Sequence, residues 1–217
     1  SRGIDFATRC AFHHSFFLAS KTAKDGSTYK NLSFPMHIPG QHDKCVGLEE
    51  KGYPRKDGSA RKGMATGTNA SEGLWMASPK NTALQDARIV LVFESAYDAM
   101  AFYQLQMRKE SGLDQRGRQD LKAGVYVSTG GNPSYGQIQG LLKAAPQATI
   151  HLGFDKDVAG KQFVANFEDI ASKQSPVAPG NVPAEMRVFM ESFDKQPRTI
   201  KELLSFNDGK YVFFISD

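Results

Sequence analysis

The pattern of apolar and polar positions changes near residue 86. After this point, short runs that are wholly or mostly apolar are each followed by a stretch with helical spacing. The expected strands are Ile89–Phe93, Val125–Val127 and Thr149–Phe154, and the helices that follow them are Tyr97–Lys109, Ile138–Ala145 and Ala159–Ser172. Wholly apolar strands that alternate with helices are typical of a parallel sheet with helices on both faces. Residues 87–217 are therefore predicted to form an α/β unit.

Three further elements are expected toward the C-terminus. Met186–Met190 is predicted to be the fourth strand of the parallel sheet, and Thr199–Phe206 a helix. Tyr211–Ile215 has the composition of a strand, but the sequence does not assign its pairing.

The first part of the chain, residues 1–86, has a different texture. From Ser20 to Gly73 it is rich in Gly, Ser, Asn, Asp and Lys, with short apolar runs at Leu32–Ile38 and Cys45–Leu48. This composition predicts short strands joined by long loops. Before it, an apolar run that is free of Gly and Pro predicts one helix through Phe12, Phe16, Phe17 and Leu18. We expect a smaller α+β subdomain in front of the α/β unit.

Composition agrees with two packed units. The chain has 217 residues, of which 40% are hydrophobic and 23% charged, values that exclude a disordered or disulfide-framework protein. No apolar run approaches the roughly 18 residues of a membrane-spanning helix, and the N-terminus lacks an apolar signal core. We therefore expect a cytoplasmic protein with no membrane partner. Because the chain does not begin with Met, we also expect further domains of a longer parent protein.

Positive charge is concentrated in the first part of the chain. Residues 1–86 hold 12 Lys and Arg against 8 Asp and Glu, whereas residues 87–217 hold 15 of each. The densest stretch is Lys51–Lys62, whose basic residues are Lys51, Arg55, Lys56, Arg61 and Lys62. Such a segment suits contact with the phosphates of a nucleic acid, but it also suits a plain solvated loop.

Candidate chemistry lies at the ends of the predicted strands. Glu94 follows the first strand, Gly130 and Gly131 lie in the turn after the second, and Asp155 and Asp157 follow the third. In an open parallel sheet these ends share one edge, where ligands bind. Neighbouring carboxylates repel one another unless a hard cation such as Mg²⁺ binds between them. In the alternative interpretation, Asp157 only caps the following helix.

These residues resemble a known family. Val-Phe-Glu-Ser-Ala-Tyr-Asp-Ala-Met at 92–100, the Gly130–Gly131 turn and Gly-Phe-Asp-Lys-Asp-Val-Ala-Gly at 153–160 together resemble the Toprim domain, which bacterial primases, topoisomerases and OLD-type nucleases share. Upstream, Arg2–Asp5, Leu32–Pro35 and Gly67–Trp75 look like part of the unnamed domain that precedes Toprim in primase-like proteins of bacterial mobile elements. That arrangement is similar to the bacterial primase catalytic core.

The resemblance implies a fold, an activity and roles for residues. It implies a Toprim-type parallel four-stranded sheet flanked by helices, with Glu94 in general acid/base work or metal binding and Asp155 and Asp157 on Mg²⁺, for which Mn²⁺ is an alternative. Asp98 is open to a capping or a site role, and Lys161 to phosphate binding or to none. The expected activity is nucleotidyl or phosphoryl transfer on DNA, as in a primase, with nuclease action as the first alternative.

The implied partners are DNA, which we expect to be single-stranded, and nucleotides. A basic first part would face the DNA through Arg55, Lys56, Arg61 and Lys62. Primase-like proteins usually carry another acidic cluster after the fourth strand, and residues 191–201 have a diluted version of it. This departure favours a third hypothesis, a non-catalytic DNA-binding module of a mobilisation protein.

A rival signal is a mirrored pair of motifs with zinc-like spacing, Cys10-x-x-His13 and His42-x-x-Cys45. The phenylalanines around the first pair instead favour a helix packed on a core, with Cys10 as a small buried residue. We do not expect structural zinc. Trp75 and His151 are both expected in the core.

Overall fold

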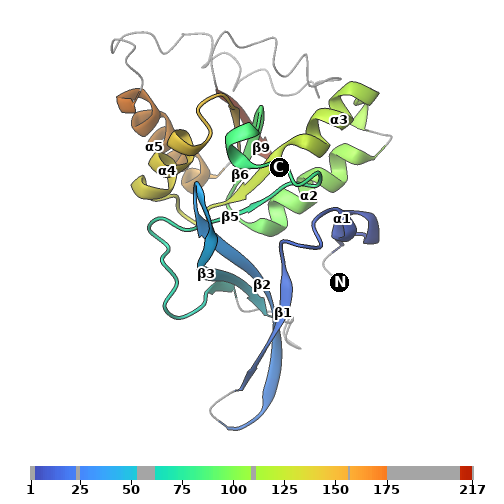
Figure 1. The fold of residues 1–217 in the computed structure, drawn as a ribbon, viewed down its shortest axis with the longest axis vertical. Coiled ribbons are helices and arrows are strands. Elements are labelled where there is room, and N and C mark those ends of the chain that lie inside the picture. The colour runs from blue at the N-terminus through green and yellow to red at the C-terminus, as the bar shows by residue number, and fades with distance from the viewer. Residues whose placement is uncertain are drawn as a thin grey trace.

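One sheet runs through both predicted parts of the chain (Figure 1). The computed structural model describes residues 3–22, 25–52, 62–108, 111–155, 157–174 and 211–216. Its strands are β1 (Phe17–Thr22), β2 (Thr28–Ile38), β3 (Gln41–Gly52), β4 (Lys62–Met64), β5 (Leu74–Ala77), β6 (Ile89–Phe93), β7 (Val125–Ser128), β8 (Thr149–Asp155) and β9 (Tyr211–Ser216). Its helices are α1 (Phe6–Ala11), α2 (Ala96–Met107), α3 (Gln115–Ala123), α4 (Tyr135–Ala144) and α5 (Val158–Gln174), with a short 3₁₀ helix at Leu84–Asp86.

The strand order divides the sheet into an antiparallel and a parallel region. Neighbouring strands follow the order β4-β3-β2-β5-β7-β6-β8-β9, and β1 pairs with β2. The pairs from β4 to β7 are antiparallel, whereas β7, β6, β8 and β9 run parallel to one another. The antiparallel pairing of β5 with β7 joins the two regions.

The predicted α/β pattern is confirmed for the parallel strands β6, β7 and β8 and for the helices α2, α4 and α5 that follow them. The C-terminal strand is also present, as β9, and it pairs in parallel with β8. The strand expected at Met186–Met190 and the helix expected at Thr199–Phe206 lie outside the described residues. Helix α3 was not predicted; its first turn is capped by Asp114, whose side chain accepts a hydrogen bond from the N–H of Gly117 at 2.7 Å.

Helices cover both faces of the parallel region. Figure 1 shows α4 and α5 on one side of the sheet and α2 and α3 on the other. Alternate residues of β6 divide between the two cores: Val90 and Val92 pack with α4 and α5, whereas Leu91 and Phe93 pack with α2. Strands that are buried on both faces are typically near-continuous apolar runs, which accounts for the sequence of β6.

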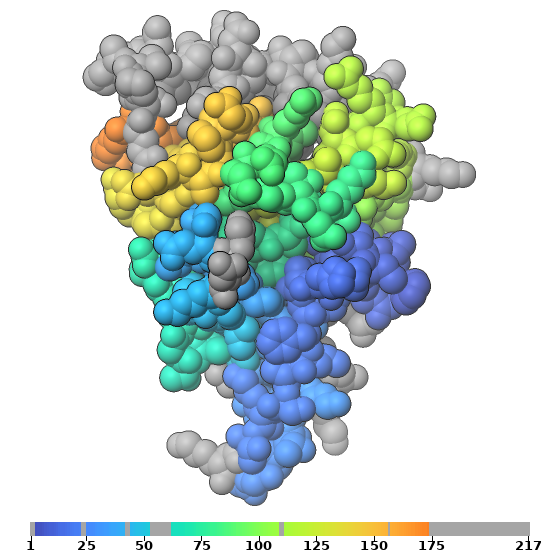
Figure 2. Space-filling model, in the orientation of Figure 1, coloured from blue at the N-terminus to red at the C-terminus, as the bar shows by residue number. Residues whose placement is uncertain are grey.

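The helix predicted through Phe12–Leu18 is wrong. Helix α1 ends at Ala11, and β1 begins at Phe17 and pairs with β2. Phe12 leaves the helix to pack edge-on against Tyr103 and Tyr126, with ring centroids 5.2 and 5.3 Å away. With Phe12 in this aromatic contact, the helix ends earlier than local sequence predicts. The β1–β2 hairpin projects from the body of the molecule (Figures 1 and 2).

Trp75 and His151 lie in the core, as predicted. The Trp75 side chain has no exposed surface, and its Nε1–H donates a hydrogen bond to the carbonyl of Ser15 at 2.7 Å. His151 is 3% exposed, and burial lowers its pKa to about 4, so the ring is neutral at physiological pH. No helix in the described part of the chain has the length and apolar character needed to span a membrane.

Candidate functional site

Glu94 lies at the carboxyl end of the central parallel strand. This strand, β6, pairs with β7 on one side and with β8 on the other. The order of the strands along the sheet therefore reverses beside Glu94. Open parallel sheets bind ligands at this position because the adjoining connections leave the sheet in opposite directions. Helix α2 begins just after Glu94. Ser95 caps it by accepting from the N–H of Asp98 at 3.3 Å and donating to the Asp98 carboxylate at 2.6 Å.

Asp155 is the last residue of β8, on the other side of this reversal, and Asp157 lies two residues beyond it. Both side chains are exposed. Asp157 Oδ1 accepts a hydrogen bond from the N–H of Gly160 at 2.8 Å, so the interpretation of Asp157 as a helix cap is confirmed. A capping carboxylate engages one oxygen in this bond, which leaves its second oxygen for another ligand. Capping and metal binding are therefore compatible at Asp157.

Gly160 has a steric reason to be glycine. A Cβ atom at this position would lie 1.8 Å from the carbonyl oxygen of Asp155. Only a residue without a side chain lets α5 start this close to the end of β8. The glycine in Asp-x-Asp-x-x-Gly thus brings the helix onto the strand end that carries both acids.

The acidic side chains affect one another across the sheet edge. Glu94 is half-buried, and its pKa is raised above the usual range, first by burial and then by the negative charges of Asp155, Asp98 and Asp157. Lys51 opposes this shift. Charges interact this way only at short range, because solvent screens distant pairs. Because β6 and β8 are adjacent and parallel, with Phe93 paired to Gly153, Glu94 and Asp155 lie at the same edge of the sheet, and Asp157 follows Asp155 by two residues.

The glycine turn after β7 is bonded to the turn that holds Glu94. Gly130 and Gly131 have φ angles of 70° and 129°, in the region that favours glycine. The N–H of Gly131 donates to the carbonyl of Glu94 at 2.9 Å, and the N–H of Thr129 donates to the carbonyl of Phe93 at 3.1 Å. The predicted active-site loop and the predicted catalytic glutamate thus form one hydrogen-bonded unit.

Sequence reasoning missed Glu49 on β3. Its side chain is buried, with Oε2 accepting from the Ser128 hydroxyl at 2.8 Å and from the N–H of Ala96 at 3.3 Å. Lys51 forms an ion pair with Oε1 at 3.1 Å. Nothing in the local sequence Glu-Glu-Lys separates a buried acid from a solvated charge run. The pairing of β3 with β2 and β4 is needed to show which of these charged side chains are buried.

The predicted nucleic-acid-binding residues are only partly described. Lys62 is exposed on β4 and is the register partner of Lys51 on β3. Arg55, Lys56 and Arg61 lie outside the described residues. Lys161 is exposed in the first turn of α5, beside the Asp155–Gly160 segment. The roles of Lys62 and Lys161 in binding phosphate stay predictions.

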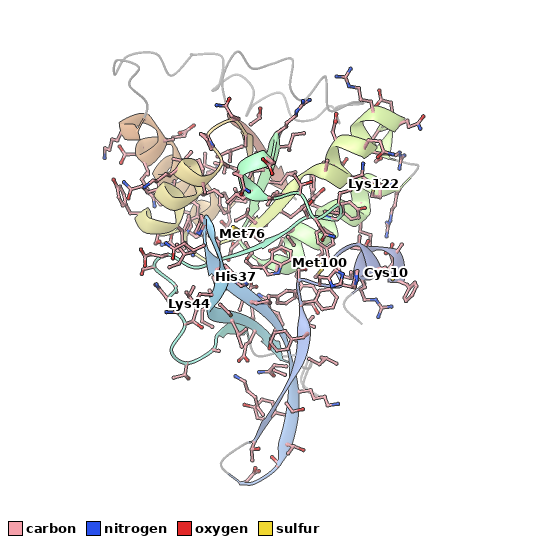
Figure 3. The ribbon with its side chains drawn as sticks, in the orientation of Figure 1. Cys10, His37, Lys44, Met76, Met100 and Lys122 are labelled. Carbon is pink, nitrogen blue, oxygen red and sulfur yellow. The ribbon has the colours of Figure 1, made fainter. Side chains whose placement is uncertain are left out.

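The structure describes three of the four side chains in the zinc-like motifs, those of Cys10, His13 and Cys45. Cys10 and Cys45 are both exposed free thiols, so the expectation that Cys10 is buried is wrong; it lies on the outer surface of α1. Figure 3 shows Cys10 on the opposite side of the view from His37, the register partner of Cys45. Within the described part of the chain, no three His, Cys, Asp or Glu side chains cluster closely enough to enclose a metal ion.

Comparison with known families agrees with this geometry. Residues 91–185 match the family model described as Toprim-like. The chain carries a Toprim-like domain. The matched region contains both acidic strand ends and the glycine turn between them.

Two solved structures show a more distant similarity. The crystal structure of the Aquifex aeolicus primase (zinc-binding and RNA polymerase domains) is 12% identical with a TM-score of 0.42, over 70% of this chain and 34% of that one. A structure of the bacteriophage T7 lagging-strand DNA polymerase interacting with primase domains of two gp4 subunits bound to an RNA/DNA hybrid and dTTP is 17% identical. Its TM-score is 0.48, over 88% of this chain and 83% of that one.

The chain spans about a third of the length of the Aquifex aeolicus chain. Both TM-scores are below 0.5, so neither similarity establishes a function. No curated protein matches this chain.

Proposed function

We propose that the chain is a primase-like nucleic-acid-processing enzyme that performs Mg²⁺-dependent nucleotidyl or phosphoryl transfer on DNA. The observation that carries this proposal is the position of Glu94 and Asp155 at the carboxyl ends of the adjacent parallel strands β6 and β8, where the strand order reverses. The raised pKa of Glu94, to which burial and then Asp155, Asp98 and Asp157 contribute, supports it. Acids that destabilise one another at a sheet edge are typical of a site built for a cation or a proton. The Toprim-like match covers this same edge.

The donor set fits Mg²⁺. This ion prefers oxygen ligands and usually takes one or two carboxylates, with waters and substrate phosphates completing its coordination. Exposed Asp155 and the second oxygen of Asp157 would supply those carboxylates. When bound, Mg²⁺ would neutralise phosphate charge and help to orient the substrate.

Glu94 would handle the proton. A carboxylate with a raised pKa is a stronger base than an ordinary one, and a general base works best when its pKa is close to the working pH. In transfer to a nucleic-acid end, Glu94 would accept the proton of the attacking hydroxyl. Lys51, which lies near enough to influence Glu94, would hold positive charge beside the substrate phosphates. Lys62 and the basic residues Arg55, Lys56 and Arg61 would extend this charge along the DNA.

One incubation distinguishes the outcomes. The protein is mixed with labelled single-stranded DNA, Mg²⁺ and nucleotides, and the product lengths are resolved. Extension supports the proposed nucleotidyl transfer. Shortening would show that the same carboxylates direct water onto a phosphodiester, as in a nuclease. DNA binding without either product would support the non-catalytic module that the diluted acidic segment at 191–201 favours. An Asp155→Asn variant tested in parallel excludes a contaminating enzyme.

A further inference from the structure

We propose that Glu49 is a positioning residue that holds the turns carrying Glu94 and Gly130–Gly131 in their working arrangement. The inference rests on the function proposed above. Glu49 belongs to β3 in the antiparallel region, yet its carboxylate reaches the carboxyl edge of the parallel region. Its side chain is 2% exposed.

One carboxylate oxygen of Glu49 contacts both turns. Oε2 accepts from the Ser128 hydroxyl at 2.8 Å, and that same hydroxyl oxygen accepts from the N–H of Gly130 at 3.1 Å. Oε2 also accepts from the N–H of Ala96 at 3.3 Å, at the first residue of α2. Glu94 lies between β6 and this helix start. The contacts therefore connect the end of β7 with the start of α2.

The other oxygen of Glu49 holds a cation. Lys51 Nζ lies 3.1 Å from Oε1, and its side chain is only 11% exposed. Lys51 is also the positive charge that acts on Glu94. Through this ion pair, Glu49 keeps Lys51 beside the acidic edge and balances the cost of its own buried charge.

Fold stability alone does not call for a carboxylate here. Burying an acid costs several kcal/mol before its partners offset that cost, and apolar replacements of buried ion pairs are often neutral or stabilising. The described polar partners of the Glu49 side chain all belong to, or act on, the candidate site. The adjacent residue Glu50 differs from Glu49 in its contacts with the site. Glu50 is equally buried, but it pairs with Lys21 at 2.6 Å and Asn31 at 3.3 Å, and neither of these has a described contact with the site.

Glu50 therefore supplies a matched control. We compare Glu49→Gln with Glu50→Gln in the full chain, measuring thermal melting, and kcat and KM for DNA extension. The amide introduced by Glu49→Gln would keep an oxygen for Ser128 and Ala96 but lose the ion pair with Lys51. We expect Glu49→Gln to lower kcat about 10-fold, in the range for supporting residues around a site. Glu50→Gln should lower the melting temperature by a similar amount and leave kcat unchanged. Equal losses of kcat in both variants would reduce Glu49 to a structural role.

A second measurement does not depend on turnover. Amide hydrogen exchange reports local opening, and the N–H groups of Ala96, Gly130 and Gly131 are the sensors. In Glu49→Gln these amides should exchange about 10-fold faster than in wild type, and in Glu50→Gln they should not change. Unchanged exchange in both variants would overturn the positioning role even if the enzyme is active. Selective acceleration in a protein that neither extends nor cuts DNA would support the positioning role and count against the proposed function.

Discussion

The N–H of Gly131 donates a hydrogen bond to the backbone carbonyl of Glu94 at 2.9 Å. This bond joins two segments that are distant in sequence but leave neighbouring parallel strands at the same edge. A change that moves one turn therefore displaces the other. The glycine turn is also bonded to Glu49 through the Ser128 hydroxyl, which accepts from the N–H of Gly130 and donates to the Glu49 carboxylate.

Asp155→Asn should separate stability from metal binding. The change removes the proposed Mg²⁺ ligand together with a charge that repels Glu94, so we expect unchanged or slightly higher stability without metal. Wild type should gain about 2.7 kcal/mol at a Mg²⁺ concentration 100 times its Kd, and the variant should gain almost nothing. Thermal melts with and without Mg²⁺ measure both effects. Asp169→Asn, exposed near the far end of α5, is the control and should keep the Mg²⁺ response. A metal-free Asp155→Asn protein that melts far below wild type would make this carboxylate structural.

Glu94→Gln should change how stability depends on pH. The pKa of Glu94 is raised above its usual value of 4.5, so the folded protein binds this proton more tightly than the unfolded chain does. The stability that this tighter proton binding contributes is fully present below pH 4.5, the usual pKa, and is lost as the pH rises through the raised pKa of folded Glu94. At pH 7 the variant should melt above wild type, and near pH 4 the difference should disappear. Melting curves at both pH values test this. A variant that is less stable at pH 7 would mean that ionised Glu94 has a stabilising partner.

Replacing Arg55, Lys56, Arg61 and Lys62 with Ala should weaken binding to single-stranded DNA. Each lost phosphate contact should reduce the slope of log affinity against log salt concentration by about 0.7. Titrations at several salt concentrations measure the slope. Arg88→Ala with Lys143→Ala is the control, because Arg88 precedes β6 and Lys143 lies in the last turn of α4, both toward the opposite edge of the sheet. An unchanged slope in the first variant would place the DNA elsewhere.

Gly160→Ala should be costly despite its small size. The new Cβ would lie 1.8 Å from the Asp155 carbonyl oxygen, so α5 or the end of β8 must move. We expect a loss of about 1–3 kcal/mol in the free energy of unfolding, with weaker Mg²⁺ binding. Denaturant unfolding measures the first and Mg²⁺-dependent melting the second. Gln162→Ala, exposed on the same helix, should stay within about 0.5 kcal/mol of wild type.

The parallel region and its acidic edge could be predicted from sequence because the controlling signals are local. A wholly apolar run identified β6 and a mostly apolar run identified β8; Glu94 directly follows the first, and Asp155 ends the second. Strand ends in a parallel sheet share an edge, so position along the chain sufficed to group these acids. The individual roles of Glu94, Asp155, Asp157 and Lys161 stay predictions until they are measured.

The antiparallel region was harder to predict because long-range contacts override its local pattern. Phe17 and Leu18 resemble a helical apolar run, yet they are exposed at the start of β1. Their conformation follows from pairing with β2, which local propensity does not encode. Glu49 was missed for the same reason. Its burial depends on strands from both regions meeting over its carboxylate.

The pairing of β5 with β7 has a consequence for how the chain tolerates cutting. A fragment starting at residue 87 would lose β5 and present β7 as an unprotected edge strand, a template for joining other chains. It would also strip Phe12 and Trp75 from the aromatic cluster around Tyr126 and leave apolar surface in water. We therefore expect residues 1–86 and 87–217 to unfold cooperatively as one unit. Separating them would favour aggregation over an independently folded Toprim-like fragment.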